Sequence, residues 1–258
     1  MMLNVNLAKF KKTHKQKKNQ VLYLSSRVSG NSEIINLINN FLVEKNSFVF
    51  ESVEKGKIKG RYTIFGKKPD RIWEFNKNKS YIIKNKKKTK IDGLPGENIE
   101  KIIENFKFKI PSSLPRISSI LAGYFSYDII RYIERIPDNC KDDLGLPDAR
   151  IIRPKVLIIH DNLEKKIFYI YNCFADEKIL NYEKKYSEIL KELEFNIFQS
   201  RLNINKVTKK VKIGKIKSNI SKKKFMNNVQ KAKEYIKIGD IFQVVISQRF
   251  ETKLTKDP

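Results

Sequence analysis

The amino-acid sequence predicts an α+β protein with mainly antiparallel sheets and flanking helices. Short runs of alternating apolar and polar residues follow one another, separated by the Gly- or Asn-containing turns typical of β-hairpins. Helical spacing of apolar residues occurs in only a few segments, so strands do not alternate regularly with helices as in a parallel sheet. The sequence contains no G-x-G-x-x-G motif and no P-loop, and so it carries neither a dinucleotide nor an ATP fingerprint.

The composition is that of a folded and strongly basic protein. The 258 residues are 40% apolar, which allows one large domain or two smaller ones with a substantial core. The formal net charge of +26 would suit a polyanionic partner such as nucleic acid or an anionic membrane surface. The basic residues are mostly Lys, however, they are spread over every segment, and no nucleic-acid-binding motif appears. We therefore expect neither a nucleic-acid nor a membrane partner.

The cysteines and histidines do not form a metal site or a disulfide framework. Cys140 and Cys173 are the only cysteines, and neither lies in a Cys-x-x-Cys or Cys/His cluster. The two histidines, His14 and His160, are far apart in the sequence, and we interpret both as structural or solvated. No apolar run approaches the roughly 18 residues of a membrane span, and residues 1–32 lack the apolar core of a signal peptide. These features predict a protein of the reducing cytoplasm.

The first part of the chain predicts a basic tail followed by hairpins. Residues 1–20 are rich in Lys and are expected to form a mobile basic tail that could include a short first helix or strand. The Lys-rich run Lys84–Lys90 is expected to be a solvated loop. Apolar patterns predict a helix over Ser32–Glu44 and short strands over Val21–Leu24, Phe48–Val53, Ile58–Phe65, Ile72–Phe75 and Tyr81–Lys84.

The next part of the chain continues with the same kinds of element and ends in a linker. The patterns predict helices over Ile99–Phe106, Ile129–Ile136 and Asp176–Leu193, and strands over Ile117–Phe125, Val156–His160 and Lys165–Phe174. Over residues 196–219 the periodic pattern dissolves into Lys, Asn and Thr, and we place a domain linker there. The linker separates an N-terminal domain, residues 21–195, from the start of a second domain, residues 220–258.

The stretch Ser221–Phe250 predicts a capped helix, a glycine stop and a strand. Ser221 is a good N-cap, and one apolar face of the helix is formed by Phe225, Val229, Ala232 and Ile236. Gly239 follows where helices commonly end in a left-handed residue. In the strand expected over Ile241–Phe250, Gln243 lies on a face that mixes polar and apolar side chains. Such a face is typical of a binding-site wall and also, more commonly, of a half-solvated strand.

Glu51 and Ser52 are polar residues in the middle of an otherwise apolar predicted strand. A buried carboxylate and a buried hydroxyl need polar partners, so this pair requires an explanation. One face of the strand could be in contact with water, or Arg61 across the hairpin could pair with Glu51. A third explanation, a role in ligand binding, follows from a family resemblance.

Four separated segments resemble the chorismate-utilising enzymes and, within that group, the large subunits (component I) of anthranilate synthases. They occur in the family's order and are FVFES with GRYTIFG, AGYFSYDIIRYIE, DDLGLPDARIIRP and GDIFQVVISQRF. The resemblance extends over residues 21–258. It implies the N-terminal part of the anthranilate and aminodeoxychorismate synthase fold, with a tryptophan feedback site in residues 21–195. It also implies that residues 220–258 begin the chorismate-binding catalytic domain.

The resemblance implies a lyase of amino-acid biosynthesis. Family members convert chorismate and ammonia into anthranilate and pyruvate, the first step of tryptophan biosynthesis. A glutamine amidotransferase subunit (component II) supplies the ammonia, and L-tryptophan is the allosteric feedback inhibitor. Magnesium (Mg2+) binds the carboxylate of chorismate, offsetting its charge. The resemblance implies that the ligands of Mg2+ come later in the family's sequences, so we expect no metal ligand within this chain.

The resemblance also implies roles for three residues. Ser52 maps to the serine that contacts tryptophan, and Glu51 to its neighbour. Gln243 maps to a position on the nucleophile side of the chorismate site, where related isochorismate and salicylate synthases have a lysine that activates water. A glutamine amide cannot act as a base, whereas ammonia already carries a lone pair, so Gln243 fits an ammonia-using enzyme. The alternative is that Gln243 is only a polar residue on a strand.

The catalytic residues that the family carries after this motif are not in the sequence. The resemblance therefore implies a C-terminally truncated fragment that is inactive alone. One alternative is aminodeoxychorismate synthase component I of the folate pathway, although QVVISQ and FVFES favour anthranilate synthase. Another alternative is a non-catalytic fragment that binds tryptophan or another protein.

Overall fold

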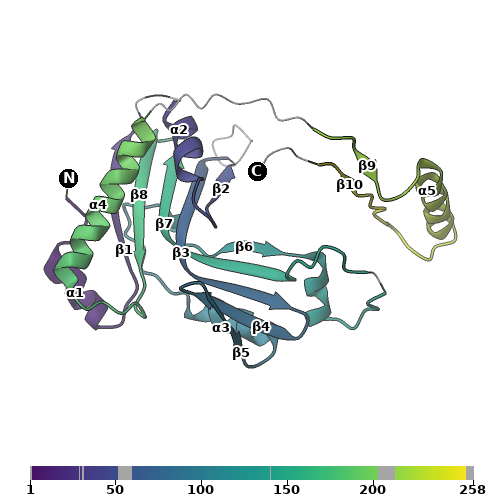
Figure 1. The fold of residues 1–258 in the computed structure, drawn as a ribbon, viewed down its shortest axis with the longest axis horizontal. Coiled ribbons are helices and arrows are strands. Elements are labelled where there is room, and N and C mark those ends of the chain that lie inside the picture. Colours follow the sequence, from purple (N-terminus) through teal and green to yellow (C-terminus); the bar gives the residue numbers. More distant parts are fainter. Residues whose placement is uncertain are drawn as a thin grey trace. The chain divides into compact units, whose positions relative to one another are not determined.

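The chain is divided into two compact units in the computed structural model of Figure 1. Unit 1 comprises Met1–Ile204 and unit 2 comprises Asn205–Pro258. The boundary between them falls within residues 196–219, which the sequence pattern predicts to be a linker. The structure describes residues 2–28, 30, 32–51, 60–139, 141–202 and 213–253.

The described part of unit 1 forms one eight-stranded antiparallel sheet. The hydrogen-bonded order is β1-β8-β7-β3-β4-β5, and in addition β2 pairs with β3 and β6 pairs with β7. This sheet and its helices confirm the predicted α+β class. The strands are β1 (Gln20–Arg27), β2 (Phe48–Glu51), β3 (Tyr62–Asn76), β4 (Lys79–Lys84), β5 (Lys87–Ile91), β6 (Ala122–Phe125), β7 (Ala149–Asp161) and β8 (Lys166–Cys173).

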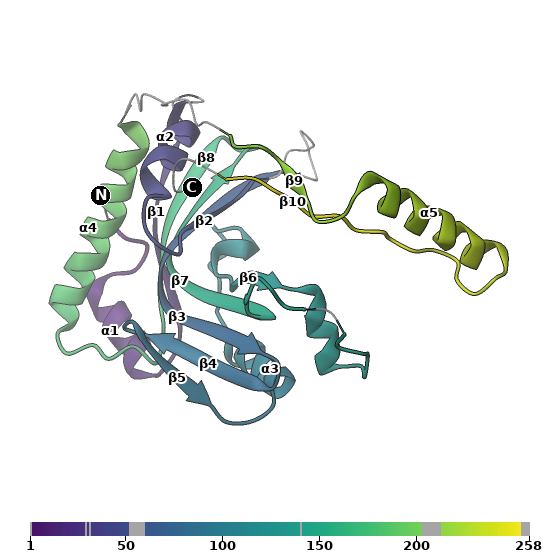
Figure 2. The same ribbon diagram turned by 45° about the vertical axis from the view of Figure 1, so that its right-hand side comes forward.

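The two long strands β3 and β7 join the two halves of the sheet (Figure 2). The β3–β7 register shifts between Pro69 and Arg71, and a bulge of this kind bends a strand. On one side of the bulge β7 also pairs with β8, and on the other side β3 pairs with β4 and β7 with β6. The sequence predicts separate strands over Ile58–Phe65 and Ile72–Phe75, which is wrong. The polar residues between them look like a break, but the β7 partner continues past the bulge.

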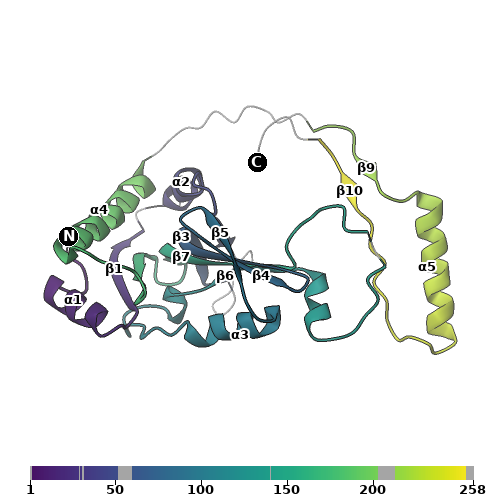
Figure 3. The ribbon, with the colours of Figure 1, turned by 60° about the horizontal axis from the view of Figure 1, so that its bottom comes forward.

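Three helices cover one face of the sheet half that contains β1, β8 and β7, and both Figure 1 and Figure 3 show them on that side. They are α1 (Leu7–Lys15), α2 (Ser32–Phe41) and α4 (Tyr182–Arg201). Phe10, Leu37 and Leu193 of these helices are fully buried with Ile158 and Tyr169 of the sheet. Each such side chain contributes about 1.5–3 kcal/mol through burial of its apolar surface. This cluster is the main core of unit 1.

The opposite face of the same sheet half is also covered. Leu157 and Ile170 point there, and Phe108, Ile110 and Leu114 pack against them. The other half of the sheet has its own cluster around Trp73 and Phe75, and the helix α3 (Pro95–Asn105) packs on it beside β4 and β5 (Figure 3). Two 3-10 helices connect these parts, η1 (Arg116–Ser118) and η2 (Tyr127–Tyr132).

Residues 1–20, predicted to be a mobile basic tail that could include a short helix or strand, contain the helix α1, which packs on the rest of unit 1. The side chain of Asn6 caps this helix by accepting a backbone hydrogen bond of 2.9 Å. Phe10 is fully buried with its ring 6.1 Å from that of Tyr182, and the Nδ1 atom of His14 lies 3.1 Å from the Tyr182 hydroxyl. The helix has few apolar positions. Contacts with α4 stabilise this helix, so the apolar pattern of residues 1–20 does not reveal it.

The Lys-rich run Lys84–Lys90, predicted to be a solvated loop, contains most of the strand β5. Asn85 and Lys86 both have left-handed φ angles, 50° and 65°, and reverse the chain so that β5 pairs with β4. The side chains are mostly exposed, as lysines on an edge strand should be. The predicted exposure to solvent is confirmed, but the predicted loop is wrong. The sequence lacks the Asn-Gly pair that usually marks such a hairpin turn, and Asn85-Lys86 makes the turn instead.

Several predicted elements are present with other bounds or another type. The helix α4 begins later than the predicted Asp176–Leu193 and extends to Arg201, inside the predicted linker. The helix predicted over Ile129–Ile136 is instead the 3-10 helix η2. The strand predicted over Ile117–Phe125 is reduced to β6, because only that part reaches β7.

The described part of unit 2 contains the helix α5 (Lys222–Lys237) and a short ladder of β9 (Lys217–Ser218) with β10 (Phe250–Glu251). The helix signals are confirmed, since the Ser221 hydroxyl accepts a hydrogen bond of 3.3 Å from the first turn and Gly239 has φ +85°. The strand predicted over Ile241–Phe250 is wrong for all but its last residue. A strand needs a neighbouring strand for its backbone hydrogen bonds, and the described residues of unit 2 supply one only at β9.

Candidate functional site

Glu51 is the last residue of β2. Its Cα lies opposite that of Thr63 in β3, and its side chain is exposed. Ser52, predicted to contact tryptophan, lies outside the described residues. Of the two residues predicted to form the inhibitor site, the structure therefore describes only Glu51, at the end of β2.

A row of polar residues crosses the sheet from Glu51. In register, Glu51 faces Thr63, and Thr63 faces His160 of β7. Residues directly opposite one another in an antiparallel sheet point to the same face, so these three side chains share a face. Thr63 and His160 are buried, whereas Glu51 is exposed. The row thus runs from a solvent-exposed carboxylate into the interior.

His160 is buried without using its polar atoms. Neither ring nitrogen has a hydrogen-bond partner in the described part of the chain. Burial lowers the pKa of His160 below its ordinary value, and the positive charge of Lys165 lowers it further. The imidazole is therefore neutral at pH 7, with one nitrogen able to donate and the other able to accept. The structural role that the sequence suggests for His160 leaves both nitrogens unexplained.

Arg61 pairs with Asp161 and not with Glu51, which was the alternative left open by the sequence. The Arg61 guanidinium donates to the Asp161 carboxylate at 3.0 and 2.6 Å. Burial alone would raise the pKa of Asp161, but the hydrogen bonds from Arg61 and from the backbone N–H groups of Leu163 and Glu164 lower it. Arg61 is therefore held at the start of β7's hairpin turn, and the Glu51 carboxylate stays available for a ligand's ammonium group.

Gln243 lies in unit 2, in the segment between α5 and β10. Its side chain is exposed, and residues 241–249 are not in a strand. The neighbouring residues at the end of this segment are held by side chains: Gln248 donates to the Ser218 hydroxyl at 2.7 Å, and the Arg249 N–H donates to Asn219 at 3.0 Å. Glu51 and Gln243 thus belong to different units, and each candidate site is defined within its own unit.

Two kinds of feature are absent from the described residues. No three His, Cys, Asp or Glu side chains there are grouped so that they could hold a metal ion. None of the described helices has the length and apolar character that crossing a membrane requires.

The family model of chorismate binding enzymes matches residues 48–258, which is most of the chain. The chain belongs to the chorismate binding enzyme family.

Relatives that it matches include component 1 and alpha subunits of anthranilate synthase, which confirms the resemblance seen in the motifs. Anthranilate synthase component 1 of Acetivibrio thermocellus is 35% identical over 230 residues, 87% of this chain and 47% of that protein. The component 1 of Cereibacter sphaeroides is 29% identical over 252 residues, 93% of this chain and 50% of that protein. The chloroplastic alpha subunit 1 of Arabidopsis thaliana is 33% identical over 237 residues, 83% of this chain and 40% of that protein. The chain spans about half the length of the curated relatives it matches.

The fold agrees with a solved structure of the same family. Anthranilate synthase component I from Streptococcus pneumoniae superimposes with a TM-score of 0.63 at 23% identity. The matched region covers 90% of this chain and 50% of that protein. At this level of identity the likeness concerns the fold, and it confirms the predicted architecture.

Proposed function

We propose that the polypeptide containing these residues acts as the large subunit of anthranilate synthase. The observation that supports this most directly is the family match over residues 48–258, together with the anthranilate synthase names of its relatives. In this reaction ammonia adds to the chorismate ring and the ring hydroxyl leaves. The enolpyruvyl group is then eliminated as pyruvate, and loss of a ring proton gives aromatic anthranilate. A glutamine amidotransferase subunit serves as the source of ammonia.

Gln243 is assigned to the nucleophile side of the chorismate site. Its amide can donate to and accept from a polar ligand but cannot remove a proton. Ammonia needs no such base, because its lone pair attacks directly. The proposal therefore gives Gln243 an orienting role, in which it holds ammonia or a polar group of chorismate.

Glu51 and Ser52 are assigned to a feedback site for L-tryptophan. The exposed Glu51 carboxylate suits the ammonium group of an amino acid, and Arg61, the cation just before β3, is occupied by Asp161. The Ser52 hydroxyl can donate to the amino acid's carboxylate. These assignments give the N-terminal sheet a regulatory role and leave the chemistry to the chorismate-binding domain.

Mg2+ remains part of the proposal only for the whole enzyme. The described residues lack a group that could hold a metal ion, so no step is assigned to Mg2+ through them. We propose that the 258 residues alone do not complete the reaction, since they span about half the length of the relatives.

A chimera tests the proposed activity. The chain is joined to the half of the Acetivibrio thermocellus protein that it does not span and is incubated with chorismate, Mg2+ and ammonium. We expect anthranilate fluorescence from the chimera and none from the 258 residues alone. Gln243→Ala should reduce kcat/KM about 100-fold, as a misplaced reactant does. Gln248→Ala, the matched glutamine control, should stay near the parent value. A folded chimera that binds chorismate but forms no anthranilate contradicts the proposal.

The same chimera tests the inhibitor site. Ser52→Ala and Glu51→Gln should each raise the tryptophan concentration needed for half inhibition about tenfold, the effect of losing about 1.4 kcal/mol. Ser47→Ala is the matched control, because the Ser47 hydroxyl donates to the backbone carbonyl of Leu42 at 3.0 Å. If tryptophan inhibits all variants equally, the site lies elsewhere.

Aminodeoxychorismate synthesis is distinguished by its product. That enzyme adds ammonia to chorismate but retains the enolpyruvyl group, so it releases no pyruvate. Coupling the chimera to lactate dehydrogenase measures pyruvate directly. Equal amounts of anthranilate and pyruvate support anthranilate synthase, and consumption of chorismate without pyruvate supports the alternative.

A further inference from the structure

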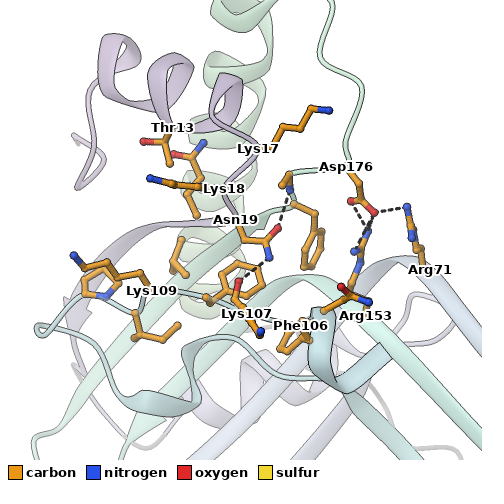
Figure 4. Close-up of a pocket in the computed structure, with 18 of the residues that line it drawn as sticks. Thr13, Lys17, Lys18, Asn19, Arg71, Phe106, Lys107, Lys109, Arg153 and Asp176 are labelled. Carbon is orange, nitrogen blue, oxygen red and sulfur yellow. Dashed lines mark hydrogen bonds and ion pairs between the residues drawn. The ribbon is translucent and has the colours of Figure 1, made fainter. Parts of the chain in front are cut away.

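Unit 1 contains a large cavity that lies away from both candidate sites. Its volume is about 1380 Å³, and it lies between α1, α3, the segment 106–113 and the ends of β1 and β8 (Figure 4). Glu51 and Gln243 are not among the residues that line it. Its size is above the usual range for small-molecule sites, about 300–1,000 Å³, so a nucleotide-sized ligand would fit.

The lining of the cavity is strongly cationic. Six lysines, Arg71 and Arg153 line it, against the single carboxylate of Asp176. That carboxylate is already bound by both arginines, at 2.9 Å in the case of Arg153. The lysines Lys9, Lys17, Lys18, Lys107 and Lys109 form no ion pair with the described residues. Uncompensated like charges around a concave surface raise the local concentration of anions.

Polar cross-links hold the cavity in shape. The Asn19 side chain donates to the Lys107 carbonyl at 2.7 Å and accepts from the Ala175 N–H at 2.8 Å. Asn19 thereby ties the start of β1 to two segments distant in sequence, and Figure 4 shows it between Lys18 and Lys107. Arg153 is fixed in addition by Asp70, at 2.8 and 2.5 Å. A preformed site loses less free energy to ordering when a ligand binds.

One wall of the cavity is aromatic. The rings of Phe106 and Phe108 lie 5.2 Å apart, and Phe108 is 5.6 Å from Phe174. Trp73 also lines this wall, and the Arg153 guanidinium stacks over Phe174 at 3.8 Å. Phe174 and Trp73 are buried, so the half-buried rings of Phe106 and Phe108 are the ones whose faces can contact a planar ligand. The cavity thus combines charges for an anion with a surface for a flat ring.

We propose that this cavity binds a phosphorylated small molecule with a planar ring, of the nucleoside triphosphate class. Lysine ammonium groups act as point charges for phosphate oxygens. The five lysines without an ion pair to the described residues suit a ligand with several negative charges better than a ligand with a single carboxylate. The segment Phe106–Ile110 contributes to both features, since Phe106 and Phe108 belong to the aromatic wall and Lys107 and Lys109 to the cationic lining. The inference does not depend on the proposed anthranilate synthase activity.

Calorimetry and Trp73 fluorescence test the proposal on the 258-residue chain. Trp73 is the only tryptophan and lines the cavity, so its emission reports binding at this place. We expect saturable binding of ATP with a change in that emission, weakened by added NaCl as screening predicts. Lys18→Ala combined with Lys109→Ala should weaken binding at least tenfold. Lys184→Ala combined with Lys191→Ala, on the exposed side of α4, should leave it unchanged.

Three further ligands separate the contributions. Inorganic triphosphate lacks the ring and adenosine lacks the phosphates, so each should bind at least tenfold more weakly than ATP. Absence of saturable ATP binding, or equal loss in the cavity and control variants, overturns the proposal. Equal binding of ATP and inorganic triphosphate overturns the role of the aromatic wall. Tighter binding of a single-stranded oligonucleotide than of ATP, lost in the cavity variants, assigns the surface to nucleic acid instead.

Discussion

Apolar runs of similar composition form a buried strand in unit 1 and an exposed segment without a strand in unit 2. In unit 1 the apolar run that ends β7 lies between two other strands, and Ile158 is fully buried. In unit 2 the equally apolar run Ile241–Ile246 forms no strand, and Phe242 is 99% exposed. Within the described residues, unit 1 holds every buried side chain, and α5 buries none.

This difference shows which secondary structure a segment forms from its own residues and which it forms only beside a neighbouring segment. The helix α5 forms because its cap, its 3.6-residue period and Gly239 all act within the same stretch of chain. A strand gains its hydrogen bonds only from another strand, which the sequence of the segment does not contain. Apolar character therefore predicts burial only where a neighbouring surface exists.

Proline substitutions should give the largest difference between the two runs. Ile158→Pro removes a ladder hydrogen bond in the middle of the sheet, and we expect it to prevent folding of unit 1. Val245→Pro, at an exposed position outside any strand, should change the free energy of unfolding by less than about 0.5 kcal/mol. Trp73 fluorescence and circular dichroism measure both. A destabilising effect of Val245→Pro would mean that this segment has strand partners after all.

Truncation of a phenylalanine should give the next largest difference. Phe65 of β3 is fully buried, and Phe65→Ala should cost about 3–5 kcal/mol of unfolding free energy. Phe225, on the apolar face of α5, is only half-buried, and Phe225→Ala should cost less than about 1 kcal/mol. Phe65→Leu is the control that keeps most of the volume. Equal costs in the two units would show that α5 packs against a surface.

Acid should destabilise unit 1 more than α5. Burial would raise the pKa of Glu177, but the ammonium groups of Lys155 and Lys185, 2.8 and 2.5 Å away, lower it below 4.5. A carboxylate with a lowered folded pKa binds its proton more readily when unfolded, so its stabilisation is complete above pH 4.5 and is lost as the pH falls through the folded pKa.

Urea titrations followed by Trp73 fluorescence between pH 7 and pH 3 measure this loss. Glu177→Gln should lower the stability at pH 7 and flatten the dependence below pH 4.5. Glu183→Gln, an exposed acid in the first turn of α4, is the matched control and should change neither. An unchanged slope in Glu177→Gln would show that other carboxylates carry the acid sensitivity.

The helix cap should give the smallest effect and should be confined to unit 2. Ser221→Ala removes the hydroxyl that accepts from the first turn, at a cost of about 1 kcal/mol to α5. Ser221→Asp keeps a cap and should restore the helix. Hydrogen exchange of the α5 amides measures this, while the Trp73 unfolding curve of unit 1 should not move. A shift of that curve would reveal coupling between the units.

The candidate sites also contain some features that a single segment reveals and others that depend on contacts between distant segments. Motifs within single segments were enough to identify the family and to select Glu51, Ser52 and Gln243. The link between Glu51 and His160 depends on the register of three strands, which no single segment contains. The cavity lysines are adjacent only because α1 packs on α4 and the segment 106–113 packs on the sheet.

The sequence by itself determined the α+β class, the capped helix α5, the hairpins β3–β4 and β7–β8, and the family, because each rests on signals local in the chain. The tertiary structure alone decided that α1 packs on α4, that Lys87–Ile91 is an edge strand and that Ile241–Arg249 is not a strand. Those outcomes depend on whether a partner lies beside the segment, and contacts between distant residues decide that.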